Sequence, residues 1–125
     1  MTENDLSYII RGAIFKVYNT LGPGLLESAY ESALVYKLEK EGLTVSRQLG
    51  LPFQYEAVKM DVGYRLDVLV NNKVIIEIKS VEILRDVHYK QLLTYLKLSN
   101  KKLGLLVNFN TSKIDENIKR IVNNL

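Results

Sequence analysis

Two apolar stretches, residues 64–70 and 74–79, are separated by the polar sequence Asn71-Asn72-Lys73. Asparagine tolerates the positive φ angles of tight turns, so this pattern predicts a β-hairpin. Successive side chains of a strand point to opposite faces. The even-numbered positions of 74–79, all apolar, therefore share a face that we expect in the core, while Glu77 and Lys79 share the other face.

Apolar residues at helical spacing predict two helices before this hairpin. The first begins at a capping box of Thr2 and Asp5 and ends at Gly22-Pro23-Gly24. The second spans about residues 25–41 and ends at Gly42. Their expected buried stripes are Ile10, Ile14, Val17 and Leu21, then Leu26, Tyr30, Leu34 and Leu38.

The other segments predict further strands and helices. Strands are expected at 44–49, 51–55 and 103–109, the last nearly all apolar and therefore buried. A helix over about 85–98 follows the hairpin, and a final helix is capped by Ser112 and Asp115. Their expected apolar positions are Leu92, Leu93 and Leu96, then Ile114, Ile118, Ile121, Val122 and Leu125. Residues 1–125 thus predict a single α/β domain whose central mixed sheet of four or five strands is flanked by helices.

Composition excludes several kinds of chemistry. The 125 residues include no Cys and one His, so disulfides, thiolate-ligated metals, Cys nucleophiles and multi-His metal sites are ruled out within one chain. No apolar run approaches the roughly 20 residues that a membrane span needs. The acidic, polar N-terminus differs from a secretion signal, and we expect a cytoplasmic protein. A net charge of +3 permits a polyanionic partner without requiring one.

Charged residues on the hairpin are the first candidates for function. Glu77 and Lys79 on a hydrophobic strand are costly if they are buried without partners, and a solvated sheet face is the less favoured explanation for them. Asp67 on the neighbouring strand favours a site, because two carboxylates beside one Lys suit Mg²⁺ or Mn²⁺. Asp67 faces Glu77 only if the hairpin loop includes Lys73; a loop of Asn71 and Asn72 alone would pair Asp67 with Ile76.

The spacing of Asp67 and Glu77-Ile78-Lys79 resembles the D-x(n)-(D/E)-x-K signature of the PD-(D/E)XK nuclease superfamily. Leu66 stands where the superfamily's name has proline. The sequence Gly24-Leu25-Leu26-Glu27-Ser28-Ala29-Tyr30 resembles the G-x-x-E-x-x-Y element that names a family of small bacterial proteins in that superfamily. The run 104–109 also resembles the corresponding sequence of that family. Gln91 and Tyr95 resemble the Q-x-x-x-Y motif of RecB-like members, so the resemblance covers nearly the whole chain.

The resemblance implies a role for each matched residue. Asp67, Glu77 and the backbone carbonyl of Ile78 would bind the metal. Lys79 would orient or help deprotonate the attacking water and offset charge on the phosphate. Glu27 would hold a metal-bound water or a second cation.

Other candidates have structural explanations beside the functional ones. Glu27 and Glu31 are neighbours at the start of a helix, where acids also interact favourably with the helix dipole. His88, Gln91 and Tyr95 are expected on one helix face, opposite the leucines of that helix, where Gln91 and Tyr95 would brace the site or contact phosphate. Tyr30 and His88 are weaker candidates for supporting the site, because packing or surface roles explain them as well.

The sequence therefore predicts an enzyme, a nuclease that hydrolyses phosphodiester bonds of DNA through a Mg²⁺-activated water, with Mn²⁺ as the alternative ion. A homodimer would present two sites to two strands. One alternative is a non-catalytic nucleic-acid-binding module that retains the nuclease fold. Another is an interaction protein whose acidic cluster binds a cation for stability. Fold by itself does not choose among these functions.

Overall fold

The computed structural model describes residues 1–125 and is built around a five-stranded sheet of order β1-β4-β5-β6-β7. The elements in chain order are α1 (Glu3–Leu21), α2 (Glu27–Lys40), β1 (Val45–Gly50), β2 (Phe53–Tyr55), β3 (Val58–Met60), β4 (Arg65–Val70), β5 (Val74–Lys79), α3 (Asp86–Ser99), β6 (Leu103–Asn108), the 3₁₀ helix η1 (Ile114–Glu116) and β7 (Ile118–Val122). β5 and β6 run parallel and the other neighbouring strands are antiparallel. The expected α/β architecture with a mixed sheet is confirmed.

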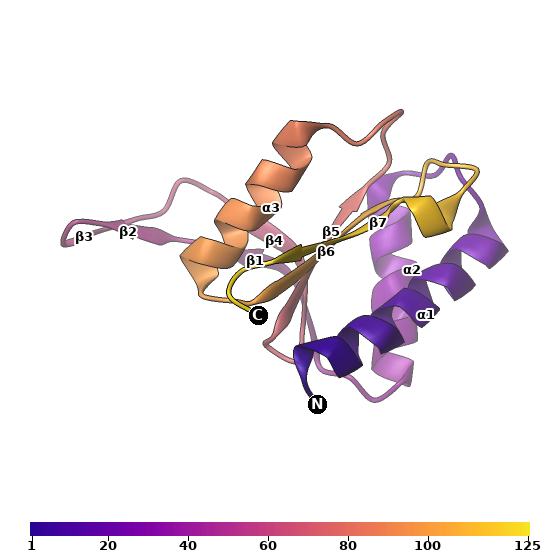
Figure 1. Ribbon diagram of the computed structural model, residues 1–125, viewed down its shortest axis with the longest axis horizontal. Helices are drawn as coiled ribbons and strands as arrows, with labels where there is room; N and C mark the ends of the chain where they lie inside the picture. The colour runs from indigo at the N-terminus through magenta and orange to yellow at the C-terminus, as the bar shows by residue number, and fades with distance from the viewer.

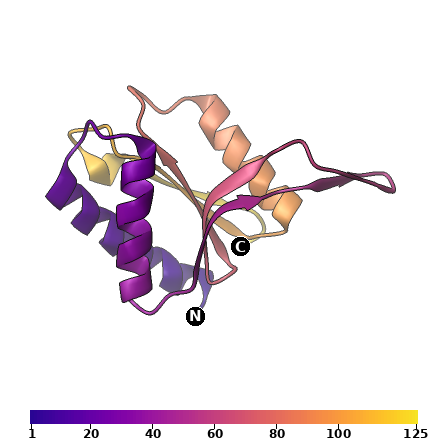
Figure 2. The same cartoon turned by 180° about the vertical axis from the view of Figure 1, so that it is seen from behind.

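The sheet lies between two helical layers, with α1 and α2 on one face and α3 on the other (Figures 1 and 2). The larger core, of 21 buried residues, joins α1 and α2 to the sheet and includes Val74, Ile76 and Ile78, as the alternation predicts. A smaller core of 8 buried residues lies under α3 and includes Ile75 and Leu92. No helix combines the length and hydropathy that a bilayer crossing requires.

The first two helices follow the sequence prediction except at their ends. The capping box of Thr2 and Asp5 forms as expected. Leu26 is 78% exposed at the N-cap of α2, and Leu21 is 40% exposed at the end of α1, so both were wrongly assigned to buried stripes. Leu21 is the last residue of α1 and Leu26 precedes α2, so both lie at helix ends beside the Gly-Pro-Gly connection, where the periodic pattern of buried positions stops.

The segment between β1 and β4 forms an arm that the sequence did not reveal. The strand expected over 51–55 is only Phe53–Tyr55, and it pairs with Val58–Met60 in a separate two-stranded sheet. This arm projects away from the layered body (Figures 1 and 2). Its second strand was missed because it has no core partner and therefore no apolar run.

The predicted C-terminal helix is wrong. η1 occupies Ile114–Glu116, and Ile118–Val122 forms β7, which pairs antiparallel with β6. The apolar residues at 114, 118, 121 and 122 fit a helical stripe, but β-branched Ile and Val favour a strand beside an available sheet edge. The final strand therefore completes the sheet rather than covering it.

Gly104 should be needed for α3 to pack on β6. A Cβ built there would lie 2.9 Å from Cγ, Cδ1 and Cδ2 of Leu92. We expect Gly104→Ala to lower the free energy of unfolding by about 1–3 kcal/mol, because overpacking forces the helix or the leucine to move. Urea denaturation measures this change. The control is Gly12→Ala at an exposed position of α1, where nothing lies within 4 Å of the added Cβ. This variant should raise the free energy of unfolding by roughly 0.5–1 kcal/mol. Equal effects of the two variants would contradict the packing argument.

Candidate active site

Asp67 and Glu77 face each other where β4 and β5 separate. The β4–β5 ladder pairs Val70 with Val74 and continues to Val68 and Ile76, the register that a three-residue loop produces. Beyond it, the Asp67 N–H donates to Glu77 Oε2 at 2.9 Å, and the Ile78 N–H donates to Asp67 Oδ2 at 2.8 Å. Each carboxylate thus accepts an amide from the opposite strand, and the register that the sequence required for this meeting is confirmed.

The sheet is also irregular on the other side of Asp67. β1 and β4 are paired on both sides of this point in one constant register, but Gln48 and Asp67 are not paired. Gln48 has φ of 47°, in the left-handed region that residues other than glycine seldom adopt. Leu66 packs in the core under α3 whereas Val68 packs in the α1–α2 core, so side-chain alternation shifts at Asp67. Sequence alternation does not reveal this shift.

An open pocket of about 420 Å³ lies between α2 and this irregular part of the sheet. Its lining residues are Glu27, Ser28, Glu31, Gln48, Asp67 and Ile78. The pocket is therefore lined by α2 on one side and by residues of β1, β4 and β5 on the other. Glu77, which is 4% exposed, is not part of this lining.

Glu31 anchors β1 to α2 beside this pocket. Arg47 donates to Glu31 Oε2 through Nε at 3.2 Å and Nη2 at 3.0 Å, and Gln48 Nε2 donates to Glu31 Oε1 at 2.7 Å. The Glu31 side chain is only 10% exposed, so these charge-assisted bonds offset its desolvation. Sequence reasoning left Glu31 as a weak site candidate and missed Arg47 and Gln48, whose spacing carries no motif.

The G-x-x-E-x-x-Y element places α2 against the end of β5. Glu27 Oε2 accepts the N–H of Ser80 at 3.2 Å, directly after Lys79. Fully buried Tyr30 donates to the Gly22 carbonyl and accepts the Leu25 N–H at 3.1 Å, which closes the connection before α2. The tyrosine thus fixes the loop from which Glu27 follows.

The segment after Lys79 is fixed from the other side by Asn108, which is 1% exposed. Asn108 Oδ1 accepts the Val81 N–H at 3.0 Å, and Nδ2 donates to the Val81 carbonyl at 2.9 Å. The sequence signal for this role is one amide at the end of the apolar strand 103–108, but its partner could not be inferred. Asn108 and Glu27 together determine where β5 ends.

The three candidate residues of α3, His88, Gln91 and Tyr95, lie in different surroundings. Tyr95 is buried among Leu92 and Leu96, so the expectation that it lies opposite the leucines is wrong. Gln91 is exposed and its Nε2 donates to the Tyr95 hydroxyl at 3.0 Å. His88 Nδ1 accepts the Arg85 N–H at 3.0 Å in the first turn of the helix.

Burial dominates the electrostatics of the two carboxyl groups. Desolvation and then the charge of Asp67 raise the pKa of Glu77 to about 8. Desolvation also raises the pKa of Asp67, against the hydrogen bond from the Ile78 amide and the charge of Lys79. Desolvation and the nearby Glu77 raise the pKa of Tyr95. The site thus holds two acids whose simultaneous ionisation is unfavourable without an added cation.

This donor set fits a hard divalent cation. Each carboxylate uses one oxygen for a backbone amide, and neither Oδ1 of Asp67 nor Oε1 of Glu77 has a hydrogen-bond partner in the chain. No three acidic or histidine side chains converge as a ligand cluster, so Glu27 does not complete one. Two carboxylates, a carbonyl and water are nevertheless a set that Mg²⁺ accepts, because it retains several waters.

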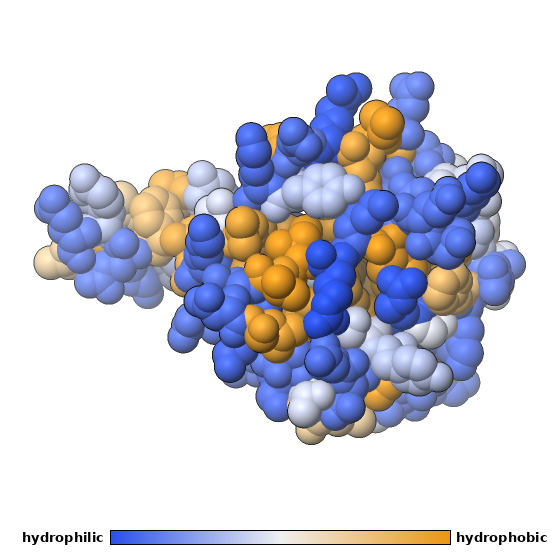
Figure 3. All heavy atoms as spheres, viewed as in Figure 1, coloured by the Kyte–Doolittle hydropathy of each residue, from blue (hydrophilic) through white to orange (hydrophobic).

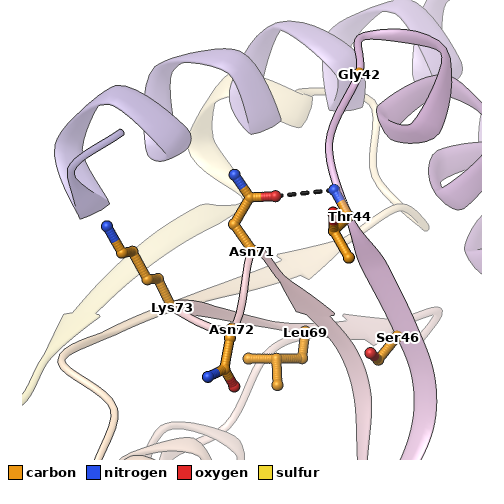
Figure 4. Close-up of a pocket in the computed structure, with 7 residues that line it drawn as sticks. All are labelled: Gly42, Thr44, Ser46, Leu69, Asn71, Asn72 and Lys73. Atoms are coloured by element: carbon orange, nitrogen blue, oxygen red, sulfur yellow. Dashed lines mark hydrogen bonds between the residues drawn. The ribbon is translucent and has the colours of Figure 1, made fainter.

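A larger pocket of about 590 Å³ lies at the opposite, turn end of the β4–β5 hairpin. Asn71 Oδ1 accepts the Thr44 N–H there at 2.8 Å, and Ser46 and Lys73 also line the pocket (Figure 4). It contains no carboxylate. The chemistry is therefore concentrated at the smaller pocket.

Residues 4–121 match the family model described as the PD-(D/E)XK nuclease superfamily. The match covers nearly the whole chain, and the chain belongs to this superfamily. No curated protein and no solved structure matches it. The superfamily consists generally of nucleases, so a nucleic acid is the implied substrate.

Ionisation of Glu77 should make the metal-free protein less stable at higher pH. Its folded-state pKa of about 8 exceeds the ordinary value of 4.5, so the folded state holds more protons between these pH values. The free energy of unfolding should therefore fall as pH rises through this window, by an amount on the order of a few kcal/mol.

Urea denaturation in EDTA at several pH values measures this effect, with Glu77→Gln as the comparison. The variant should lose the fall and be more stable than the wild type above pH about 8. Asp67, Lys79 and Glu27 also act on this carboxyl, so Glu27→Gln serves as a neighbour control that retains most of the slope. An unchanged slope in Glu77→Gln would assign the titration to another group.

Proposed function

We propose that the protein is a divalent-metal-dependent nuclease that hydrolyses phosphodiester bonds of DNA. The observation that carries the proposal is the reciprocal arrangement of Asp67 and Glu77 at the separated ends of β4 and β5, with Lys79 two residues further on. A net charge of +3 is compatible with a polyanionic substrate.

Asp67, Glu77 and the Ile78 carbonyl would hold Mg²⁺ or Mn²⁺. The bound ion would supply Lewis acidity, and so a water nucleophile at neutral pH and a counter-charge for the phosphate. The two carboxylates are suited to this task because a bound ion offsets the desolvation, and the weaker charge repulsion, that raise both pKa values.

Lys79 would orient the attacking water and stabilise charge that develops on the phosphate. Lys79 is two residues after Glu77 on β5, and its positive charge lowers the pKa of both carboxyls. Glu27 would orient water from the pocket wall, where it already accepts the Ser80 amide. Exposed Gln91, bonded to Tyr95, would contact phosphate on the α3 side, with His88 supporting the first turn of that helix.

We also infer membership of the small bacterial G-x-x-E-x-x-Y group. The support is that each named residue of its element has a distinct task near the pocket. Gly24 has φ of 99° in the connection, Glu27 contacts Ser80, and Tyr30 closes the connection by bonding to both ends.

Lys79→Ala should abolish metal-dependent cleavage. Loss of a group that positions the nucleophile and offsets charge is expected to lower the rate at least about 100-fold. The assay uses labelled linear, circular, single-stranded and branched DNA, and RNA, with Mg²⁺, Mn²⁺ or EDTA. The matched control is Lys73→Ala at the turn end of the same hairpin, which should cleave normally. Metal-independent binding with no cleavage of any substrate would instead favour a non-catalytic binding module.

Divalent metal should stabilise the wild-type protein more at pH 8 than at pH 6, because Glu77 must lose its proton to bind a cation. Thermal melting with Mg²⁺ or Mn²⁺ measures this, and saturation at 100 times the dissociation constant corresponds to about 2.7 kcal/mol. Asp67→Asn should remove the shift, and Glu39→Gln on the exposed face of α2 should retain it. A full shift in Asp67→Asn would place the ion elsewhere.

A further inference from the structure

The arm formed by β2 and β3 has one apolar and one polar face. Cross-strand partners share a face, so Phe53 with Met60 and Tyr55 with Val58 lie on one side. Gln54 and Lys59, paired between them, lie on the other. Figure 3 shows the arm standing clear of the body, with no layer of the protein over the side that faces the viewer. Phe53 and Met60 are half-buried, whereas Tyr55 is 61% exposed and Val58 57% exposed, so the apolar face has no partner toward the tip of the arm.

A row of aromatic rings joins this face to the candidate active site. The Phe53 and Tyr64 ring centroids are 6.4 Å apart, and those of Tyr64 and Tyr95 are 6.0 Å apart. The Tyr95 hydroxyl accepts from Gln91, and Tyr95 belongs to the smaller core together with Leu66, the residue directly before Asp67. The row therefore runs from the arm to the α3 side of β4, beside Asp67.

The base of the arm is fixed to the strands that carry the site. The Leu51 N–H donates to the Tyr64 carbonyl at 2.7 Å, directly before β4. Arg65, the first residue of β4, donates to the Gln48 carbonyl at 3.4 Å. Anything held along the arm is thus placed within a few residues of Gln48 and Asp67, where the pocket lies.

Charge on the arm argues against a grip on duplex phosphates. Between Gly50 and Arg65 the acidic residues Glu56 and Asp61 balance the basic residues Lys59 and Arg65. Binding to the phosphates of a duplex depends on an excess of Lys and Arg. Exposed aromatic faces beside such a balanced surface instead suit unpaired bases, which stack on them whatever their sequence.

We propose that the arm is a stacking platform for unpaired nucleotides, and that the site therefore acts on single strands or on the single-stranded parts of branched substrates. Tyr55 and Tyr64 are the stacking residues, and the aromatic row leads the strand toward the carboxylates. The proposal rests on the proposed nuclease function for its biological meaning, but the binding itself needs no catalysis.

A second copy of the chain is a less suitable occupant. A stable interface buries about 800 Å² on each partner. Tyr55 and Tyr64, 61% and 43% exposed, would contribute roughly 200 Å² together, and the arm adds only two three-residue strands. The experiment below therefore also measures whether the chain dimerises through the arm.

The test measures binding in EDTA, so that cleavage plays no part. The probes are a fluorescent oligothymidylate, an abasic oligomer of the same length and a fully paired duplex. Wild type should prefer the oligothymidylate, and Tyr55→Ala and Tyr64→Leu should each weaken that binding about 5- to 100-fold. Binding to the abasic strand should change by less than about twofold in the variants, because it has phosphates without bases. Tyr64→Phe, which retains the ring, should bind as the wild type does.

The control is Tyr36→Ala on α2, since Tyr36 is 64% exposed and lies outside the arm. Equal affinity of Tyr55→Ala and wild type for oligothymidylate overturns the proposal, as does a wild-type preference for the duplex. Sedimentation of the same variants detects a second copy of the chain bound to the arm. An oligomer that is lost in Tyr55→Ala without a change in DNA binding also overturns the stacking proposal. If the protein binds oligothymidylate through these tyrosines but cleaves no substrate, the nuclease function is refuted and the stacking proposal stands.

Discussion

The structure depends on two carboxylates that replace backbone carbonyls at the end of a β-ladder. Backbone amides inside a sheet need hydrogen-bond acceptors, and the amides of Asp67 and Ile78 lie at the point where the regular β4–β5 pairing ends. Glu77 and Asp67 supply these acceptors. The side chains hold the strands apart, and the separation opens a polar pocket at the end of a sheet whose remainder is apolar. Fold and candidate site thus arise from the same pair of hydrogen bonds.

Contacts from three other elements keep this irregular region in place. Glu31 of α2 bonds Arg47 and Gln48 of β1, and Asn108 at the end of β6 bonds both backbone groups of Val81. Every side-chain nitrogen and oxygen that is shut off from solvent has a hydrogen-bond partner, and the free carboxylate oxygens of Asp67 and Glu77 keep some solvent contact. A partly satisfied buried network would be costlier than an apolar core, so this pairing allows charges to be positioned inside the fold.

The sequence predicted what depends on local periodicity, and it failed where tertiary pairing decides. The hairpin follows from turn chemistry and alternation, but the sequence left its loop length open, and the structure selects the three-residue loop that brings Asp67 to Glu77. The residues of β7 fit a helical stripe equally well, and only the open edge of β6 selects the strand. The positive φ of Gln48 and the shift of alternation at Asp67 leave no pattern, because they result from side chains inserted between strands. The arm was missed because strands that contact no core show no core-facing periodicity.

The two sides of the site differ in charge. The carboxylates of Asp67 and Glu77 lower the stability of the metal-free protein once both are ionised, because desolvation and then the charge of neighbouring acids raise their pKa values. A divalent ion would reverse that cost from the α2 side, where the pocket opens. The α3 side carries Tyr95 and the aromatic row, which are neutral and hold no metal. One face thus concentrates charge while the other presents aromatic rings, and Asp67 and Glu77 lie at the boundary between them.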